Sequence, residues 1–145
     1  MNPDTLSLRD VQVGDALPEL AIELTTTGIV AGAIASRDYQ DVHHDSDAAR
    51  AQGMPNVFMN ILTTNGYVGR YVTDWAGPEA RLQNVSIRLG APNLPGDTMR
   101  MKGTVRTVEP RPDHGLVEVE VSGGNAYGEH VTGTVRLALP LEPLA

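Results

Sequence analysis

One long apolar segment followed by four shorter segments of a different period constrains the fold most. Within residues 57–75, large apolar side chains recur every three or four residues and occupy more than one face, which predicts a helix ended by the Gly77-Pro78 pair. The next segments alternate with a period of two or are rich in valine and threonine, which predicts antiparallel strands over 82–89, 97–108, 116–121 and 130–139. A helix this apolar needs a cover, so we predict an α+β domain spanning residues 1–145, with an antiparallel sheet wrapped around one long central helix.

The segments before this helix are shorter. Residues 17–27 are apolar and β-branched, which predicts a strand that completes the sheet. The small apolar residues 29–36 predict a short buried helix, and they lead into a polar loop over 37–45. Helix-capping residue types then predict a short helix over 47–52, which Gly53 ends.

Charge and composition exclude several classes of function. Eighteen acidic and eleven basic residues give a formal charge of -7, the wrong sign for a nucleic acid or an anionic lipid surface. The most apolar run, residues 28–35, is far shorter than the roughly 20 residues that span a bilayer, so we expect no membrane segment. Residues 1–15 carry four charged side chains and no apolar stretch typical of a secretory signal, so we expect a cytoplasmic protein.

The loop over residues 37–45 is the most unusual stretch, because six of its nine side chains are acids, bases or histidines. Asp38 and His43 lie five positions apart on an irregular loop and can curl toward one point. There a carboxylate and an imidazole could bind a water molecule and transfer its protons. Adjacent side chains usually point apart, so we expect His44 to face solvent and Asp45 to bond to backbone at the next helix start.

Residues 38–43, Asp-Tyr-Gln-Asp-Val-His, resemble the Asp-x-Asn-Pro-(aliphatic)-His signature of MaoC-like (R)-specific enoyl-CoA hydratases. The resemblance extends to Val-Gly-Asp at 13–15, to the long helix after Pro55 and to Leu-Pro-Gly-Asp-Thr at 94–98. Residues 58–64 and 71–75 are similar, more narrowly, to the small subunits of actinobacterial steroid side-chain enoyl-CoA hydratases.

This resemblance implies a hotdog fold and the reversible hydration of a trans-2-enoyl-CoA to a 3-hydroxyacyl-CoA, without a cofactor. It implies that Asp38 and His43 act on one water molecule, with the choice of acid and base left open. It places substrate-binding groups at the backbone N–H of Met59, near the start of the long helix, and at the hydroxyl of Thr64, while the Gln40 amide braces the loop. A donor at a helix N-terminus suits the enolate charge that develops on the thioester oxygen.

The sequence departs from the family pattern at three places. Arg37 replaces a common glycine before the aspartate, Gln40-Asp41 replaces Asn-Pro, and Phe58-Met59 replaces His-Gly. Without the proline, other contacts must hold the geometry between the two catalytic side chains. Met59 adds a flexible apolar side chain that suits a bulky acyl group.

The resemblance also implies partners: an acyl-CoA thioester and a hotdog partner subunit, in a homodimer or in a heteromer with a larger MaoC-like subunit. The alternative function is a non-catalytic subunit that completes the thioester site of its partner. Retention of Asp38 and His43 argues against this alternative, while the changes at Arg37 and Gln40-Asp41 favour it mildly. A metal site at residues 41–45 has no second ligand cluster elsewhere, so we predict none.

Overall fold

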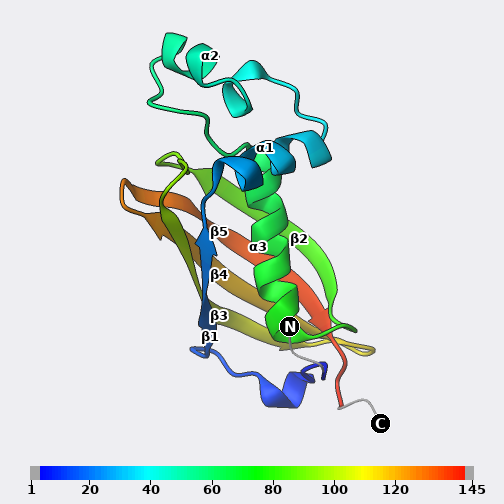
Figure 1. Ribbon diagram of the computed structural model, residues 1–145. Coiled ribbons are helices and arrows are strands. Elements are labelled where there is room, and N and C mark those ends of the chain that lie inside the picture. Colours follow the sequence, from blue (N-terminus) through cyan, green and yellow to red (C-terminus); the bar gives the residue numbers. More distant parts are fainter. Residues whose placement is uncertain (1–3, 143–145) are drawn as a thin grey trace.

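The computed structural model describes residues 4–142, so the two ends of the predicted 1–145 domain, residues 1–3 and 143–145, lie outside the described part. It contains one sheet, one long helix and a set of short helical segments (Figure 1). In chain order the elements are η1 (Leu8–Asp10), β1 (Ala16–Glu23), α1 (Thr26–Ala35), η2 (Asp41–His43), α2 (Ser46–Ala51), α3 (Ile61–Ala76), β2 (Arg81–Leu89), β3 (Thr98–Pro110), β4 (Gly115–Asn125) and β5 (Gly128–Leu139).

The five strands form an antiparallel sheet in the order β1-β3-β4-β5-β2. Figure 1 shows this sheet curving around α3, with α1, η2 and α2 gathered beyond one end of it. The predicted α+β class and the hotdog arrangement are confirmed. Among residues 4–142 no helix is long and apolar enough to cross a membrane.

β2 does not lie beside β3, the strand that follows it in the chain. Only β3, β4 and β5 form a meander, and β2 pairs with β5 at the far edge of the sheet. Most of its side chains are exposed, as suits an edge strand that carries arginines at both ends. The alternating pattern identifies a strand and its buried face, but it does not specify which strand lies beside it.

The buried face of the sheet packs on one face of α3. Thr64, Val68, Tyr71, Val72 and Ala76 are the buried residues of the helix, spaced at ones, threes and fours. They meet valines and methionines from the inner face of the meander, which are 0–1% exposed: Met99, Met101, Val105, Val117, Val119, Val121, Val131 and Val135. Each such burial contributes about 1.5–3 kcal/mol, so this interface provides most of the hydrophobic stabilisation.

Several predicted boundaries are wrong, and capping residues explain two of them. The predicted strand over 17–27 ends at Glu23, because Thr25 caps α1 by accepting the Gly28 N–H at 2.9 Å. The long helix begins at Ile61 rather than at residue 57, because Asn60 caps it by accepting the Thr63 N–H at 3.1 Å. The prediction places threonine in a strand and asparagine inside a helix, whereas both serve as N-caps here.

Candidate active site

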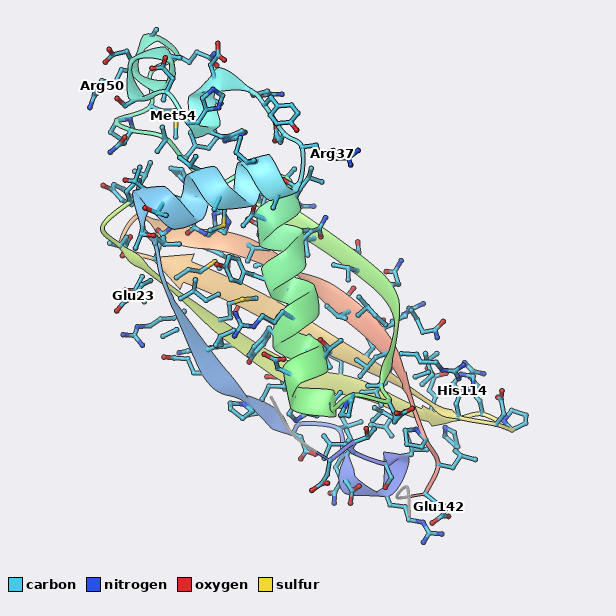
Figure 2. All side chains as sticks on the ribbon, turned by 45° about the vertical axis from the view of Figure 1, so that its right-hand side comes forward. Glu23, Arg37, Arg50, Met54, His114 and Glu142 are labelled. Carbon is cyan, nitrogen blue, oxygen red and sulfur yellow. The ribbon has the colours of Figure 1, made fainter. Side chains whose placement is uncertain are left out.

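Asp38 follows a tight ending of α1. Ser36 is the C-cap, Arg37 N–H donates to the Ile34 carbonyl at 3.0 Å, and Asp38 N–H donates to the Ala33 carbonyl at 2.9 Å. This pair of bonds is a Schellman motif, whose residue after the cap adopts a left-handed backbone. Arg37 occupies that position with φ of 57°, and its side chain points away from the body of the protein (Figure 2). The motif explains why glycine is common before the aspartate in the family pattern.

This backbone conformation gives a testable prediction. Arg37→Gly should leave stability unchanged or raise it by up to about 1 kcal/mol, because glycine avoids the cost of the left-handed region but loses more chain entropy. Arg37→Val should lower it by more than about 1 kcal/mol, because a β-branched side chain fits that region worst. Urea unfolding of both variants measures the difference, and equal stabilities would contradict this account of the loop.

His43 is held from the opposite side, by the segment that precedes α3. Its Nδ1 lies 2.7 Å from the Phe58 carbonyl, and its ring meets the Phe58 ring edge-on at 4.9 Å. A carbonyl oxygen only accepts, so Nδ1 carries the proton and Nε2 of the neutral ring has a free lone pair. His43 is 5% exposed, so this orientation is fixed by packing as well as by the hydrogen bond.

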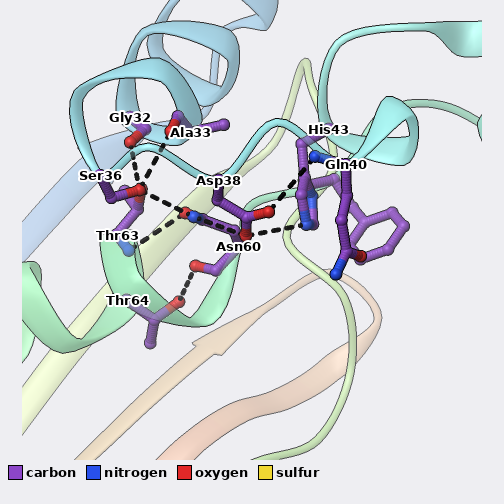
Figure 3. Close-up of polar contacts among 10 residues, drawn as sticks. Gly32, Ala33, Ser36, Asp38, Gln40, His43, Asn60, Thr63 and Thr64 are labelled. Carbon is purple, nitrogen blue, oxygen red and sulfur yellow. Dashed lines mark hydrogen bonds and ion pairs between the residues drawn. The ribbon is translucent and has the colours of Figure 1, made fainter.

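The structure brings Asp38 and His43 together. Nε2 of His43 lies 3.4 Å from Oδ2 of Asp38 (Figure 3). A hydrogen bond from Asn60 is the largest cause that holds the pKa of Asp38 below its ordinary value, while burial acts in the opposite direction. Two hydrogen-bond acceptors therefore face the same point, and a water molecule there could donate one hydrogen to each of them.

Gln40 contacts this pair through its backbone. Its N–H lies 3.4 Å from Oδ1 of Asp38, and the residue itself is exposed. The loop is thus braced by a main-chain amide rather than by the side-chain amide predicted from the sequence. A contact between the Gln40 side chain and a substrate stays a prediction.

Met59 does not lie at the helix start where we expected it. It precedes the Asn60 cap in a non-helical segment, and its N–H donates to the Asn93 carbonyl at 3.1 Å. The amide expected to hold the thioester oxygen is therefore already paired in this conformation. The later start of α3, which follows from the Asn60 cap, is the physical reason for the difference.

Thr64 is fully buried and pairs with a histidine that the sequence marked only as a strand start. Its Oγ1 lies 2.9 Å from Nε2 of His130, whose Nδ1 lies 2.6 Å from the Ala91 carbonyl. Because the carbonyl requires the proton on Nδ1, the Thr64 hydroxyl donates to Nε2. The Thr64 hydroxyl therefore donates to a group of the protein itself, and this hydrogen bond links α3 to β5.

Burial lowers the pKa of His130, which predicts a pH dependence of stability. As pH falls below 6.5, the ordinary value, unfolded chains take up a proton that folded His130 does not, so stability should fall. His130→Gln should remove this part of the slope, and the exposed His44→Gln should keep it. Urea unfolding between about pH 5 and pH 8 measures all three proteins, and the same slope in His130→Gln as in the wild type would contradict the prediction.

The neighbouring acids and histidines do not join the site. Asp45 accepts the N–H groups of Asp47 and Ala48 and caps α2, as predicted. His44 is exposed and lies 3.7 Å from Asp41, and His114 lies on the β3-β4 turn at the other end of the molecule from Arg37 (Figure 2). Within residues 4–142, no three histidine, aspartate or glutamate side chains gather closely enough to hold a metal ion.

Comparisons with known proteins identify the family of the chain. The family model described as MaoC like domain matches residues 12–127. The chain is 50% identical over 127 residues, 88% of this chain and 95% of the relative, to the 3-oxo-4,17-pregnadiene-20-carboxyl-CoA hydratase beta subunit of Mycobacterium tuberculosis (strain ATCC 25618 / H37Rv).

Solved structures give the same result. The crystal structure of the ChsH1-ChsH2 complex from Mycobacterium tuberculosis includes a chain with a TM-score of 0.85 and 49% identity, with 89% of this chain and 98% of that chain covered. The R-hydratase PhaJ1 from Pseudomonas aeruginosa has a TM-score of 0.83 at 19% identity, with 98% and 90% covered, which shows the fold alone. The chain belongs to the MaoC-like domain family.

Proposed function

We propose that this protein catalyses the reversible hydration of a trans-2-enoyl-CoA to the 3-hydroxyacyl-CoA, with Asp38 and His43 as its catalytic residues. The observation that carries the proposal is the 3.4 Å approach of Nε2 of His43 to Oδ2 of Asp38. Each of the two side chains is fixed by its own hydrogen bond, from Asn60 to Asp38 and from His43 to the Phe58 carbonyl. Two fixed acceptors of this kind suit a reaction whose second substrate is water.

The proposed steps follow from this arrangement. The water oxygen bonds to the β-carbon, one water proton passes to Nε2 of His43, and the electrons of the double bond move onto the thioester oxygen. The α-carbon then takes a proton from His43, which restores the thioester and the neutral ring. We assign the proton to His43 because imidazole is ordinarily a stronger base than a carboxylate, and Asp38 stays ionised beside the imidazolium.

The other predicted residues have smaller parts in this proposal. The Gln40 backbone helps to orient Asp38, and Thr64 acts through its place beside Asn60 in the first turn of α3. The Met59 amide has no part while it is paired with Asn93. The Met59 side chain stays a candidate for contact with the acyl group.

We further propose a steroid side-chain acyl group and a larger MaoC-like subunit as the partner, within one hotdog domain over residues 1–145. The 50% identical relative is named a hydratase of a pregnadiene carboxyl-CoA and a beta subunit, and the structure of 49% identity is a two-protein complex. Ile34, Tyr39, Ile61 and Leu62, on the segments that carry Asp38 and Asn60, are 48–63% exposed. Such exposed apolar side chains beside the site suit contact with an apolar acyl group or with a second subunit. The cytoplasm is the location that we propose for a coenzyme A thioester enzyme.

A comparison of substrates tests this proposal. The protein, purified with any chain that accompanies it, is added to a short enoyl-CoA and to a steroid side-chain enoyl-CoA, and the loss of enoyl-thioester absorbance is followed. We expect turnover of both, with the higher kcat/KM on the steroid substrate. A higher kcat/KM on the short substrate would contradict the steroid assignment, and turnover of neither would contradict the hydratase.

A further inference from the structure

We propose that Asn60 is a positioning residue for this reaction, whose side-chain amide sets which oxygen of Asp38 faces Nε2 of His43. This inference rests on the hydratase function proposed above and adds a residue that the sequence pattern did not single out. Asn60 is 2% exposed and lies 22 positions along the chain from Asp38. It is the N-cap of α3 and lies outside the loop that carries the catalytic pair.

The hydrogen bonds of Asn60 fix the orientation of its amide. Oδ1 accepts the N–H of Thr63 at 3.1 Å, and Nδ2 donates to Oδ2 of Asp38 at 3.0 Å and to Oγ of Ser36 at 2.9 Å (Figure 3). A flipped amide would place an oxygen against the carboxylate of Asp38 and a nitrogen against the N–H of Thr63, so only one orientation is favourable. Both hydrogens of Nδ2 are therefore used, one of them on the catalytic carboxylate.

Ser36 extends this network into α1. Its hydroxyl lies 2.8 Å from the Gly32 carbonyl and 3.1 Å from the Ala33 carbonyl, so it donates toward α1 and accepts from Asn60. Hydrogen bonds thus fix the position of the Asp38 carboxylate relative to both the end of α1 and the start of α3. Two packed helices hold it, in addition to the loop on which it lies.

The same short segment also holds His43. The Phe58 carbonyl orients the His43 ring, and two residues later Asn60 orients Asp38. The loop has no proline between Asp38 and His43 that could fix their separation from within. Residues 58–60, which lie outside the loop, fix the separation of Asp38 and His43 instead. Asn60 occupies one lone pair of Oδ2 and leaves the other free on the side of His43.

Asn60→Ser separates positioning from capping, since serine is also a good N-cap but cannot reach Asp38 with an amide. We expect kcat to fall roughly tenfold to hundredfold with KM little changed, because a small misplacement of a reacting group is costly. The pKa of Asp38, followed through the NMR signal of its carboxyl carbon as pH is varied, should rise, because the carboxylate loses its strongest donor. Asn60→Asp keeps the cap and adds a second carboxylate, so it should raise the pKa of Asp38 further.

The matched control is Asn65→Ser, an exposed asparagine on the same helix, which should match the wild type in kcat and in the pKa of Asp38. Urea unfolding of each variant reports any loss of the helix cap. An Asn60→Ser protein with wild-type kcat and an unchanged pKa of Asp38 would overturn the positioning role while the hydratase stands. A wild-type protein without hydratase turnover would overturn both proposals.

Discussion

His43→Gln and Asp38→Asn should each lower kcat by a factor of about 10² to 10⁴, with the fold and any assembly intact. Each replacement keeps the approximate size of the side chain. His43→Gln removes the base that takes the water proton, and Asp38→Asn removes the negative charge beside the imidazolium. Because the two side chains lie 3.4 Å apart and act on one water molecule in this proposal, the double variant should be little slower than the slower single variant. Initial rates on an enoyl-CoA measure the effect, with size-exclusion chromatography and urea unfolding as checks on structure.

The neighbouring residue supplies the control for this prediction. His44→Gln changes an exposed imidazole that lies near Asp41 and not near Asp38, so it should keep the wild-type rate. A His43→Gln protein that keeps its rate but loses its partner subunit would show that the loop is a brace, as in a non-catalytic subunit. That outcome would contradict the catalytic assignment.

Gly133→Ala should destabilise the protein by about 3 kcal/mol, the largest effect on stability that we expect from one methyl group. Gly133 lies in β5 between Ile87 of β2 and Val121 of β4. A Cβ there would lie 2.1 Å from the Ser86 carbonyl oxygen and 2.8 Å from the Ile87 Cα. Both are backbone atoms of β2, so relief requires β2 to move away from the sheet.

Gly124→Ala is the matched control, because a Cβ at that position in β4 meets its nearest atom, the Gly128 carbonyl oxygen, at 3.5 Å. It should cost about 1 kcal/mol or less, within the range of ordinary substitutions. The free energies of unfolding in urea give the comparison. Equal losses at Gly133 and Gly124 would show that β2 does not pack on β5 as described.

The sequence predicted the types of most elements because their periods are strong and local. The strands of the meander and the long helix are each identified by side chains a few residues apart. The place of β2 beside β5 could not be predicted in this way, because a strand pattern carries no information on its neighbour. The first turn of α1 was missed because three threonines in a row favour a strand unless one of them caps a helix.

The proximity of Asp38 and His43 could be predicted because they lie on one loop in a recognisable spacing. Asn60 and His130 could not, because their contacts join residues 22 and 66 positions apart. An asparagine before an apolar helix is a capping signal that would have corrected the helix start and the place of Met59. The hydrogen bond from Asn60 to Asp38 depends on how α1 packs against α3, which no local pattern specifies.

The most direct test of the hydratase is to follow the oxygen of water into the product. The protein, purified with any accompanying chain, is incubated with an enoyl-CoA in water labelled with oxygen-18, and the products are identified by mass spectrometry. The account predicts an intact coenzyme A thioester with one labelled hydroxyl on the β-carbon, and no such product with His43→Gln. Label in a free carboxylic acid, or a labelled hydroxyl that forms equally fast with His43→Gln, would contradict it.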